Sequence, residues 1–445
     1  MTPDGAVPAA GAPSAEEVVR RVGEAGARLL DLQFSDIAGG GRRMTVPATL
    51  LPAIFDHGYR FDGAAVMGGL REVELDLFLV PDPSTLIIYP DPGDGQRARL
   101  TCSVRRRDGQ PFAGDPRSIL ERTVERARDL GFEYRVAVEL EYYLFRDEDV
   151  PLDAPGYFGI GGGPGSATRD EILTTLHGMG MAVGGAHHET GPGQEELDLL
   201  TTGAVRMADQ LLTVRQVIRS AAASHGLRAN FMPKPRSDAP GSGMHVFQRL
   251  RRIADGGDAL RGTGDELSPT GRHAIAGLIE RAGVASAVWS PSVNSYKRLA
   301  AGHRAPRHAT WARLSQASLI RVPVPGPSTG AVVEIELRSP DNMANPYLAF
   351  ALALACMLDG IERGEEPPPA LDENLVRYDD EELERLGIAR LPATMGQALD
   401  LFAEDPMPRA ALGDYVCDGF LLAKRAEWEE FRRHVSPWEQ ARYGV

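Results

Sequence analysis

Apolar and polar positions alternate along this chain with the spacing of helices in some segments and of strands in others. Together these patterns predict a small β-rich segment followed by a longer segment of mixed helices and strands. From Glu16 to Leu30 apolar residues recur at helical spacing, which predicts an amphipathic helix. Short strand-like stretches follow at LLDLQFSDIAG, LDLFLVPDPSTLIIYP and RARLTCSVRRRDG. We therefore predict a β-rich N-terminal domain over residues 15–109, after a disordered Pro/Ala/Gly leader over residues 1–14.

The rest of the chain alternates between strand and helix patterns. Asp115 and Pro116 precede the run ILERTVERARDLG, which is typical of a helix N-terminus. Strand-like YRVAVELEYYLF and AVVEIELRSPD then alternate with helix-like AVRMADQLLTVRQVIRSAAASHG and NPYLAFALALACMLDGIERG. This order predicts an α+β fold, with a catalytic domain over residues 112–445.

Composition narrows the possible partners and location. A net charge of −14 over 445 residues disfavours nucleic acid as a partner, because phosphate contacts need a basic surface. No apolar run reaches the roughly 18 residues of a membrane helix, and the first residues lack a secretory signal. Cys102, Cys356 and Cys417 are too far apart for a metal knuckle and favour a reducing compartment. We predict a cytoplasmic protein without a nucleic-acid or membrane partner.

Two acidic residues share one face of a predicted strand. In YRVAVELEYYLF the apolar side chains have one parity, whereas Glu139 and Glu141 have the other. Strand side chains alternate between faces, so both carboxylates project from the same side. Such close like charges repel each other unless cations lie between them. A solvated strand face with two surface glutamates is the alternative.

A second acidic cluster surrounds a Gly-Pro-Gly turn. Glu189 and Glu196 flank this turn in HHETGPGQEE, which aims two carboxylates at one point. Glu195 competes with Glu196, but neighbouring strand residues face opposite ways, so only one of the two should face a cleft. His187 and His188 are either ligands or ordinary hydrogen-bonded residues.

Two more strand patterns carry polar faces. After a Gly-Ser-Gly turn, three residues share one face: His245, Phe247 and Arg249. Near the end of the chain another polar face holds Glu334, Glu336 and Arg338. Five or six acids and one histidine on strands with apolar backs suit a hard-cation site with oxygen and imidazole ligands.

The ordered motifs resemble those of the glutamine synthetase family. VELEYYLF, HHETGPGQEE, FMPKP, GSGMH, VNSYKRL, LIRVP and ELRSPDNMANPYLAF occur in the family's order, FDGAA at Asp62 resembles its FDGSS, and LLAKRAEWEEFRRHVSPWEQARY resembles its last helix. The resemblance implies a small β-grasp domain followed by a barrel-like α/β catalytic domain. It also implies homo-oligomers, either hexameric rings or dodecamers, with active sites between neighbouring subunits.

The resemblance also implies roles for individual residues. It predicts two or three Mg²⁺ or Mn²⁺ ions and ATP as cofactors, with the metal ligands Glu139, Glu141, Glu189, Glu196, His245 and Glu336. Arg298 and Arg338 resemble contacts to the substrate carboxylate, near Gly241, and Arg321 resembles a phosphate contact. Asp62 would reach the cleft of a neighbouring subunit. The alternative for the arginines is that they only pair with acids.

The chain departs from the family around the ammonium and nucleotide contacts. Arg304 replaces the flap glutamate that deprotonates ammonium, and Gln316 replaces an arginine that contacts the phosphoryl group. Pro240 replaces an asparagine near the amino-acid substrate. On the nucleotide side Phe247 replaces a histidine, Arg249 a serine and Glu334 an arginine; with Arg321, these residues are the predicted ATP contacts.

These departures favour changed chemistry, and three functions stay open. The first is an ATP-dependent ligase that joins a carboxylate, the γ-carboxyl of glutamate, to an amine other than ammonium through an acyl phosphate. The catalytic residues would be Arg298, Arg304, Arg321 and Asp62. The second is an ordinary glutamine synthetase, and the third is a non-catalytic paralogue. A metal-dependent reaction without ATP is also compatible with the altered contacts.

Overall fold

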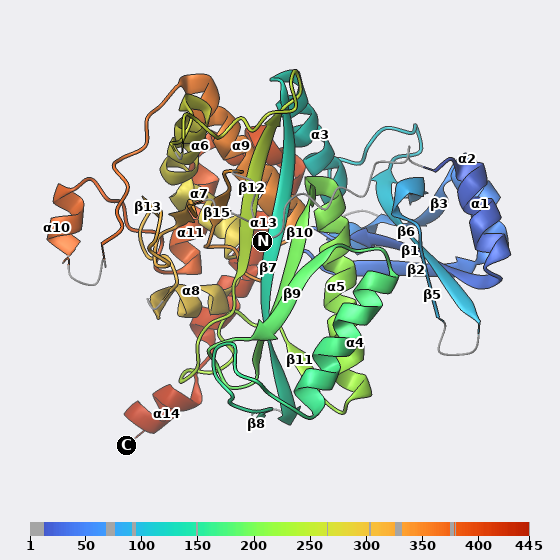
Figure 1. Cartoon of the computed structure of the whole chain (residues 1–445), viewed down its shortest axis with the longest axis horizontal. Helices are drawn as coiled ribbons and strands as arrows, with labels where there is room; N and C mark the ends of the chain where they lie inside the picture. The colour runs from blue at the N-terminus through green and yellow to red at the C-terminus, as the bar shows by residue number, and fades with distance from the viewer. Residues whose placement is uncertain are drawn as a thin grey trace.

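The computed structural model describes most of the chain. The described residues are 13–67, 76–90, 95–147, 150–264, 266–301, 304–324, 332–373, 378 and 380–444. Residues 1–12 of the predicted leader lie outside them. Figure 1 shows a smaller N-terminal domain at one side of the molecule and a larger domain built around long central strands.

In its described residues, the N-terminal domain has a six-stranded sheet and two α-helices. Its elements are α1 (Ala15–Glu24), β1 (Ala27–Ser35), β2 (Gly41–Pro47), α2 (Leu51–His57), β3 (Tyr59–Asp62), β4 (Asp76–Pro81), β5 (Ile87–Pro90) and β6 (Gln96–Arg105). The strand order is β2-β1-β6-β4-β3, with β5 on β6. β1 runs parallel to β6, and the other pairings are antiparallel. Val18 and Val22 of α1 pack with Leu30 and Leu32 of β1 in the core.

The predicted first helix was too long. It ends at Glu24 instead of Leu30, and Leu29 and Leu30 belong to β1. Gly26 follows with φ of 65°, a left-handed conformation that ends the helix at little cost only for glycine. The apolar spacing continued through this turn because β1 buries its own leucines, so the pattern alone did not show the boundary.

The larger domain contains a nine-stranded sheet. Its strands are β7 (Phe132–Asp147), β8 (Val150–Pro151), β9 (Val183–His188), β10 (Gln194–Gly203), β11 (Arg228–Asn230), β12 (Met244–Arg252), β13 (Trp311–Ala312), β14 (Ile320–Arg321) and β15 (Ile335–Leu337). The order is β13-β14-β15-β12-β7-β10-β9, and β8 and β11 also pair with β7. Segments distant in sequence thus become neighbours around β7.

Besides this sheet, the larger domain contains the remaining helices of the described part of the chain. They are α3 (Pro116–Asp129), α4 (Pro164–Gly178), α5 (Ala204–Ser224), α6 (Pro269–Glu280), α7 (Ala282–Trp289), α8 (Val293–Ala300), α9 (Pro346–Arg363), α10 (Asp380–Arg385), α11 (Met395–Glu404), α12 (Pro406–Leu412), α13 (Asp414–Arg433) and α14 (Pro437–Tyr443). α3 and α5 contact β7, and α9 lies against α3, α5 and α6. Among the described helices, none is both long and apolar enough to cross a membrane.

The predicted alternation along β7 is confirmed. Val136, Val138 and Leu140 are fully buried in the main core. Glu139 and Glu141 lie on the opposite face, where they line a cavity. The α+β architecture is therefore as predicted, and the polar face of the sheet carries the candidate functional residues.

Candidate active site

A cavity of about 500 Å³ lies over the polar face of the central strands. Its wall includes carboxylates, arginines and one histidine, from both sheet and loops. The lining residues that the sequence predicted either as site residues or as departures from the family pattern are Glu139, Glu141, Glu189, Glu196, Pro240, Gly241, His245, Arg298, Arg304, Gln316, Arg321 and Arg338. The cavity thus gathers motifs that are spread over 200 positions of the sequence.

Strand register explains why these side chains meet. On the two long central pairs, His245 of β12 lies opposite Glu139 of β7, and Glu196 of β10 lies opposite Glu141. β15 follows on the other side of β12 and brings Glu336 into the same row of strands. Because side chains opposite each other in a sheet share a face, the register alone places these groups together.

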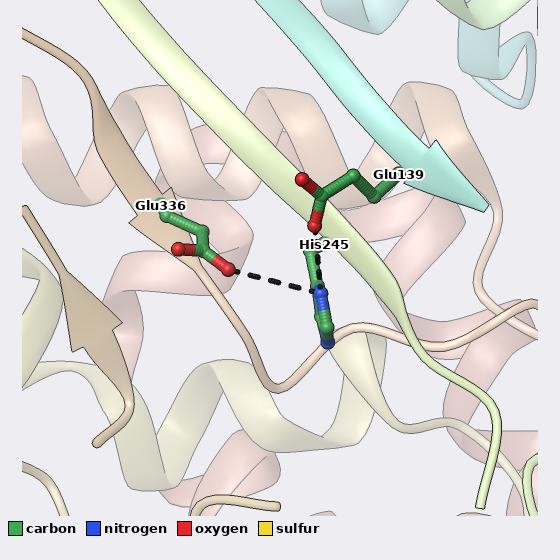
Figure 2. A group of neighbouring side chains, drawn as sticks. All are labelled: Glu139, His245 and Glu336. Carbon is green, nitrogen blue, oxygen red and sulfur yellow. Dashed lines mark hydrogen bonds and ion pairs between the residues drawn. The ribbon is translucent and has the colours of Figure 1, made fainter. Parts of the chain in front are cut away.

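The first group that could hold a metal ion is formed by Glu139, His245 and Glu336. One ligand atom from each lies within 4.8 Å of the others. His245 Nδ1 is 3.2 Å from Glu139 Oε2 and 3.7 Å from Glu336 Oε1, and Figure 2 shows both carboxylates directed at this ring nitrogen. Two carboxylates and one imidazole are ligands for Mg²⁺ or Mn²⁺, so these residues fit the expected cation.

A second group contains Glu139, Glu196 and Asp198. Asp198 was not among the predicted ligands, although it has the same strand parity as Glu196 and lies opposite Glu139. Its other neighbour across the sheet is Gly185, which has no side chain to compete for the space. Asp198 Oδ1 is buried without a hydrogen-bond partner, which suits a cation ligand.

The remaining acids differ in whether their side chains face the cavity. Glu141 contacts the first group, with its Oε1 3.8 Å from His245 Nε2. Glu189 lines the cavity but belongs to neither group, and its carboxylate accepts hydrogen bonds from Thr190. Glu195 faces away and pairs with Arg169, Nε to Oε2 at 2.8 Å. The prediction that only one of the adjacent glutamates faces the cleft is confirmed.

The two adjacent histidines have hydrogen-bonding roles. His187 Nε2 lies 3.3 Å from Glu196 Oε1, and His188 Nε2 lies 3.1 Å from Asp153 Oδ1. Neither belongs to a group of potential metal ligands among the described residues. Burial opposes the charged form of His187, but its bonds to Glu196 and to the His188 carbonyl outweigh burial and raise its pKa to about 9. The structure thus favours the alternative without metal ligation.

Burial dominates the electrostatics of the potential metal ligands. It raises the pKa of Glu141 to about 7, with a further contribution from the charge of Glu196. It also raises the pKa of Glu139 well above its usual value, helped by Glu336 and Glu196. Burial and nearby arginines hold the pKa of His245 well below its usual value, so its ring is a neutral ligand. A bound cation would relieve the repulsion among the carboxylates.

The predicted substrate and phosphate arginines surround this acidic centre. Arg321 and Arg338 both form ion pairs with the fully buried Glu336. Arg298 is buried beside the Gly-Ser-Gly turn and donates to the carbonyl oxygens of Ser339, at 2.8 Å, and of Arg338, at 2.9 Å. A Cβ on Gly241 would lie 2.6 Å from Cγ of Arg298, so the turn needs glycine there. Arg298 is held by carbonyl oxygens, not by an acid.

Three of the predicted nucleotide contacts are buried outside the cavity wall. Phe247, Arg249 and Glu334 have exposed fractions of 3%, 8% and 7%, and none lines the cavity, whereas Arg321 does. Arg249 Nε donates to Glu334 Oε1 at 2.8 Å, and Arg249 Nη2 is 2.7 Å from the same oxygen. Two separate departures from the family pattern are therefore partners in one buried ion pair.

Arg304 points into the site from its loop. It lines the cavity with φ of 60°, and its Nη1 donates to Thr190 Oγ1 at 3.2 Å. Its Cζ lies 5.7 Å from the ring centre of Tyr157. Asp62, in contrast, is exposed at the end of β3 and is not part of the cavity wall of its own chain.

Comparisons with known proteins agree with this geometry. The family profile described as glutamine synthetase, catalytic domain, matches residues 113–443, and the profile described as glutamine synthetase, beta-Grasp domain, matches residues 26–107. The chain belongs to the glutamine synthetase family. The N-terminal β-grasp domain and the glutamine synthetase-type catalytic domain that the motifs predicted are therefore confirmed, as is membership of a family of ATP-dependent ligases that bind divalent metals.

Individual relatives match over nearly the full length. The glutamine synthetases of Halobacterium salinarum and Thermus thermophilus are each 38% identical to this chain. The first alignment covers 94% of both chains, and the second covers 96% of this chain and 98% of the relative. Among solved structures, a GmaS/ADP complex superimposes with a TM-score of 0.84 at 28% identity, covering 96% of this chain and 99% of that one.

Proposed function

We propose that this glutamine synthetase-family protein joins the γ-carboxyl group of glutamate to an amine other than ammonium, at the expense of ATP. The observation that carries the proposal is a contrast within one cavity. The Glu139, His245 and Glu336 group and its flanking arginines are complete, whereas a guanidinium group, Arg304, lies beside Glu189 and Thr190. The residues that would activate a carboxylate are thus retained. At the position where a cationic amine would bind, however, the side chain carries a positive charge.

The proposed reaction has two steps. A γ-carboxylate oxygen of glutamate attacks the terminal phosphorus of ATP, and ADP leaves with the electron pair of the broken P–O bond. The amine lone pair then attacks the acyl carbon, inorganic phosphate leaves with the electron pair of the C–O bond, and the nitrogen gives up one proton to a carboxylate of the cavity. Divalent cations, when bound, neutralise charge that develops on the phosphoryl oxygens.

The protein's own residues have distinct tasks in these steps. Arg321 and Arg338 are placed to bind anionic oxygens, because both line the cavity while Glu336 fixes their positions. Arg298 presents a fixed positive charge next to the Gly241 turn, where a substrate carboxylate would bind. The buried Arg249–Glu334 pair does not line the cavity and would support its nucleotide side from outside the wall.

Arg304 is the residue on which amine choice depends. A guanidinium group stays protonated, so it neither attracts ammonium nor removes its proton. We expect poor turnover of ammonium and efficient turnover of an amine that is uncharged at neutral pH. Arg304→Glu should raise kcat/KM for cationic amines by about tenfold or more, since like charges in close contact cost at least about 1.4 kcal/mol. Initial rates with glutamate, ATP, Mg²⁺ and an amine panel measure this.

The matched control is Arg307→Glu in the same loop. Arg307 is exposed and does not line the cavity, so this variant changes the net charge equally without changing the site. Ammonium turnover with a millimolar or lower KM that Arg304→Ala leaves intact would support an ordinary glutamine synthetase. Binding of metal and ATP without turnover of any amine or of hydroxylamine would support a non-catalytic paralogue.

We also propose a ring-shaped homo-oligomer with composite active sites. Asp62 is exposed and outside the cavity of its own chain, so any catalytic use of it requires a second subunit. We expect light scattering at micromolar concentration to give a mass several times that of one chain. Asp62→Ala and Glu139→Gln subunits should each be inactive and should regain activity when they are co-assembled. A monomeric mass, or no recovery in mixed assemblies, would contradict this arrangement.

A further inference from the structure

The approach to the cavity has an aromatic wall, formed by Tyr157, Phe158 and His187. The Phe158 and His187 rings are stacked, with centroids 4.1 Å apart and planes at 24°. Tyr157 meets both edge-on, at 4.6 Å from Phe158 and 5.6 Å from His187. Tyr157 lines the same cavity as the potential metal ligands, so the aromatic wall is continuous with the catalytic centre.

Backbone strain is concentrated at this edge of the cavity. Phe158 and Arg304, with φ of 53° and 60°, are the non-glycine residues with positive φ in the part of the chain that the structure describes. They come from loops about 150 positions apart, yet Arg304 lies over the ring of Tyr157, the neighbour of Phe158. Such conformations persist when surrounding contacts fix them and are concentrated at ligand-binding positions. Here the Phe158 amide donates to the His188 carbonyl at 3.0 Å.

The wall leaves a large apolar surface uncovered next to a cation. Tyr157 is 52% exposed and Phe158 is 62% exposed. Aromatic faces pack well against other flat rings, and a planar guanidinium group also stacks on such rings. A flat ring packed on the exposed surfaces of Tyr157 and Phe158, beside the Arg304 guanidinium, would cover this apolar surface, and an amino group on that ring would enter the cavity that Tyr157 lines.

From this arrangement we propose that the amine is an arylamine, with its nitrogen attached directly to a flat aromatic ring. The inference rests on the proposed ligase function and specifies its second substrate. The nitrogen lone pair of an arylamine is delocalised into the ring, so the amine is uncharged at neutral pH and is not repelled by Arg304. Attack of that lone pair on the acyl carbon releases inorganic phosphate, and the nitrogen transfers one N–H proton to a cavity carboxylate.

An amine carrying a carboxylate fits these surroundings less well. The Arg304 guanidinium already donates to the hydroxyl group of Thr190, which in turn donates to Glu189 at 2.8 Å. An anionic substituent here would meet Glu189 and the carboxylates behind it, whereas an uncharged ring meets no such repulsion.

The test compares aniline with cyclohexylamine, β-alanine, ammonium and hydroxylamine, using glutamate, ATP and Mg²⁺. Cyclohexylamine has the size of aniline but is a cation without a flat ring. Hydroxylamine is small and uncharged, so γ-glutamyl hydroxamate reports carboxylate activation independently of the aromatic wall. We expect hydroxamate formation, and kcat/KM for aniline at least about tenfold above those for cyclohexylamine and β-alanine.

Variants then locate the ring. Tyr157→Ala and Phe158→Gly should raise KM for aniline about tenfold, and by several-fold more than they raise KM for hydroxylamine. Phe158→Gly also relieves the positive φ, so loss of folding does not account for its effect. Ile160→Ala, a fully exposed position of the same loop, should change neither.

Four results would overturn the inference. Hydroxamate without aniline turnover, or better use of β-alanine than of aniline, would refute the arylamine assignment and leave the ligase function standing. Equal aniline KM values in wild type and in both wall variants would also refute it. No hydroxamate and no turnover of any amine would remove the proposed function and the inference together.

Discussion

Glu139→Gln is expected to reduce ligase activity by at least about 100-fold, because a metal ligand at such a site contributes several kcal/mol of charge stabilisation. Glu139 belongs to both groups that could hold a cation, so its loss affects each of them. The amide has the shape of the carboxyl group and can still bond to His245, which is 3.2 Å away. The fold should therefore be retained while metal affinity is lost.

The same variant should have the opposite effect on the metal-free protein. Burial and the charges of Glu336 and Glu196 raise the pKa of Glu139, so its ionised form destabilises the empty site. Without metal, the melting temperature of Glu139→Gln should equal or exceed that of wild type. With saturating Mg²⁺ or Mn²⁺ the order should reverse, because only wild type gains from binding. Thermal unfolding with and without metal measures both changes.

The pH dependence provides an independent check. A carboxyl group whose pKa is higher in the folded than in the unfolded state stabilises the fold fully below its unfolded pKa. For Glu141 that stability is present below pH 4.5 and is lost as the pH rises through about 7. Metal-free wild type should thus become less stable between pH 5 and pH 8. Saturating metal should reduce this dependence of stability on pH, because a bound cation neutralises the carboxylates in place of protons.

Glu133→Gln is the matched control for these measurements. Glu133 has the same strand parity on β7 as Glu139, but it lies outside the cavity and pairs with Arg251 at 3.1 Å. It should leave activity and the metal-dependent melting shift unchanged. If Glu139→Gln kept the wild-type metal shift, the two-group assignment would be wrong.

How much the sequence could predict depended on whether a contact is local or crosses strands. The shared face of Glu139 and Glu141 follows from the alternation of side chains along one strand, and so does the expectation that only one of Glu195 and Glu196 faces the cleft. The family motif, not the alternation, identified that residue as Glu196. Asp198 follows from the same alternation as Glu196, but it lies beyond the glycine-rich turn and its flanking acids, which were the predicted ligands. The helix boundary at Glu24 depended on a left-handed glycine that apolar spacing does not reveal.

Contacts between distant segments needed the structure. Arg249 and Glu334 were recognised as two separate departures, since sequence alone does not give the register between β12 and the segment before β15. Likewise, no local pattern predicts that Tyr157 and Phe158 lie near Arg304, because loops lack the repeating spacing of apolar residues that identifies helices and strands. In both cases the structure brings into contact residues that the sequence does not connect.

The buried pair of Arg249 and Glu334 leads to the second large effect. Glu334→Leu alone should lower the free energy of unfolding by about 3–5 kcal/mol, because it removes the acid that pairs with a buried guanidinium group. The side chains of the pair are only 10% and 9% exposed, so water cannot replace the lost partner. Chemical denaturation at constant pH and metal concentration measures the change.

Removing both charges should be far less harmful than removing one. The Arg249→Met, Glu334→Leu double variant should lie within about 1 kcal/mol of wild type, since well-packed apolar side chains often replace a buried ion pair without loss. Asp255→Leu is the control: Asp255 pairs with Arg252, which lies on the same strand as Arg249 and is 44% exposed, and loss of that pair should cost less than about 1 kcal/mol. If Glu334→Leu cost no more than this control, Arg249 would have another compensating partner. The two departures would then be independent changes instead of one exchange of charge between neighbouring strands.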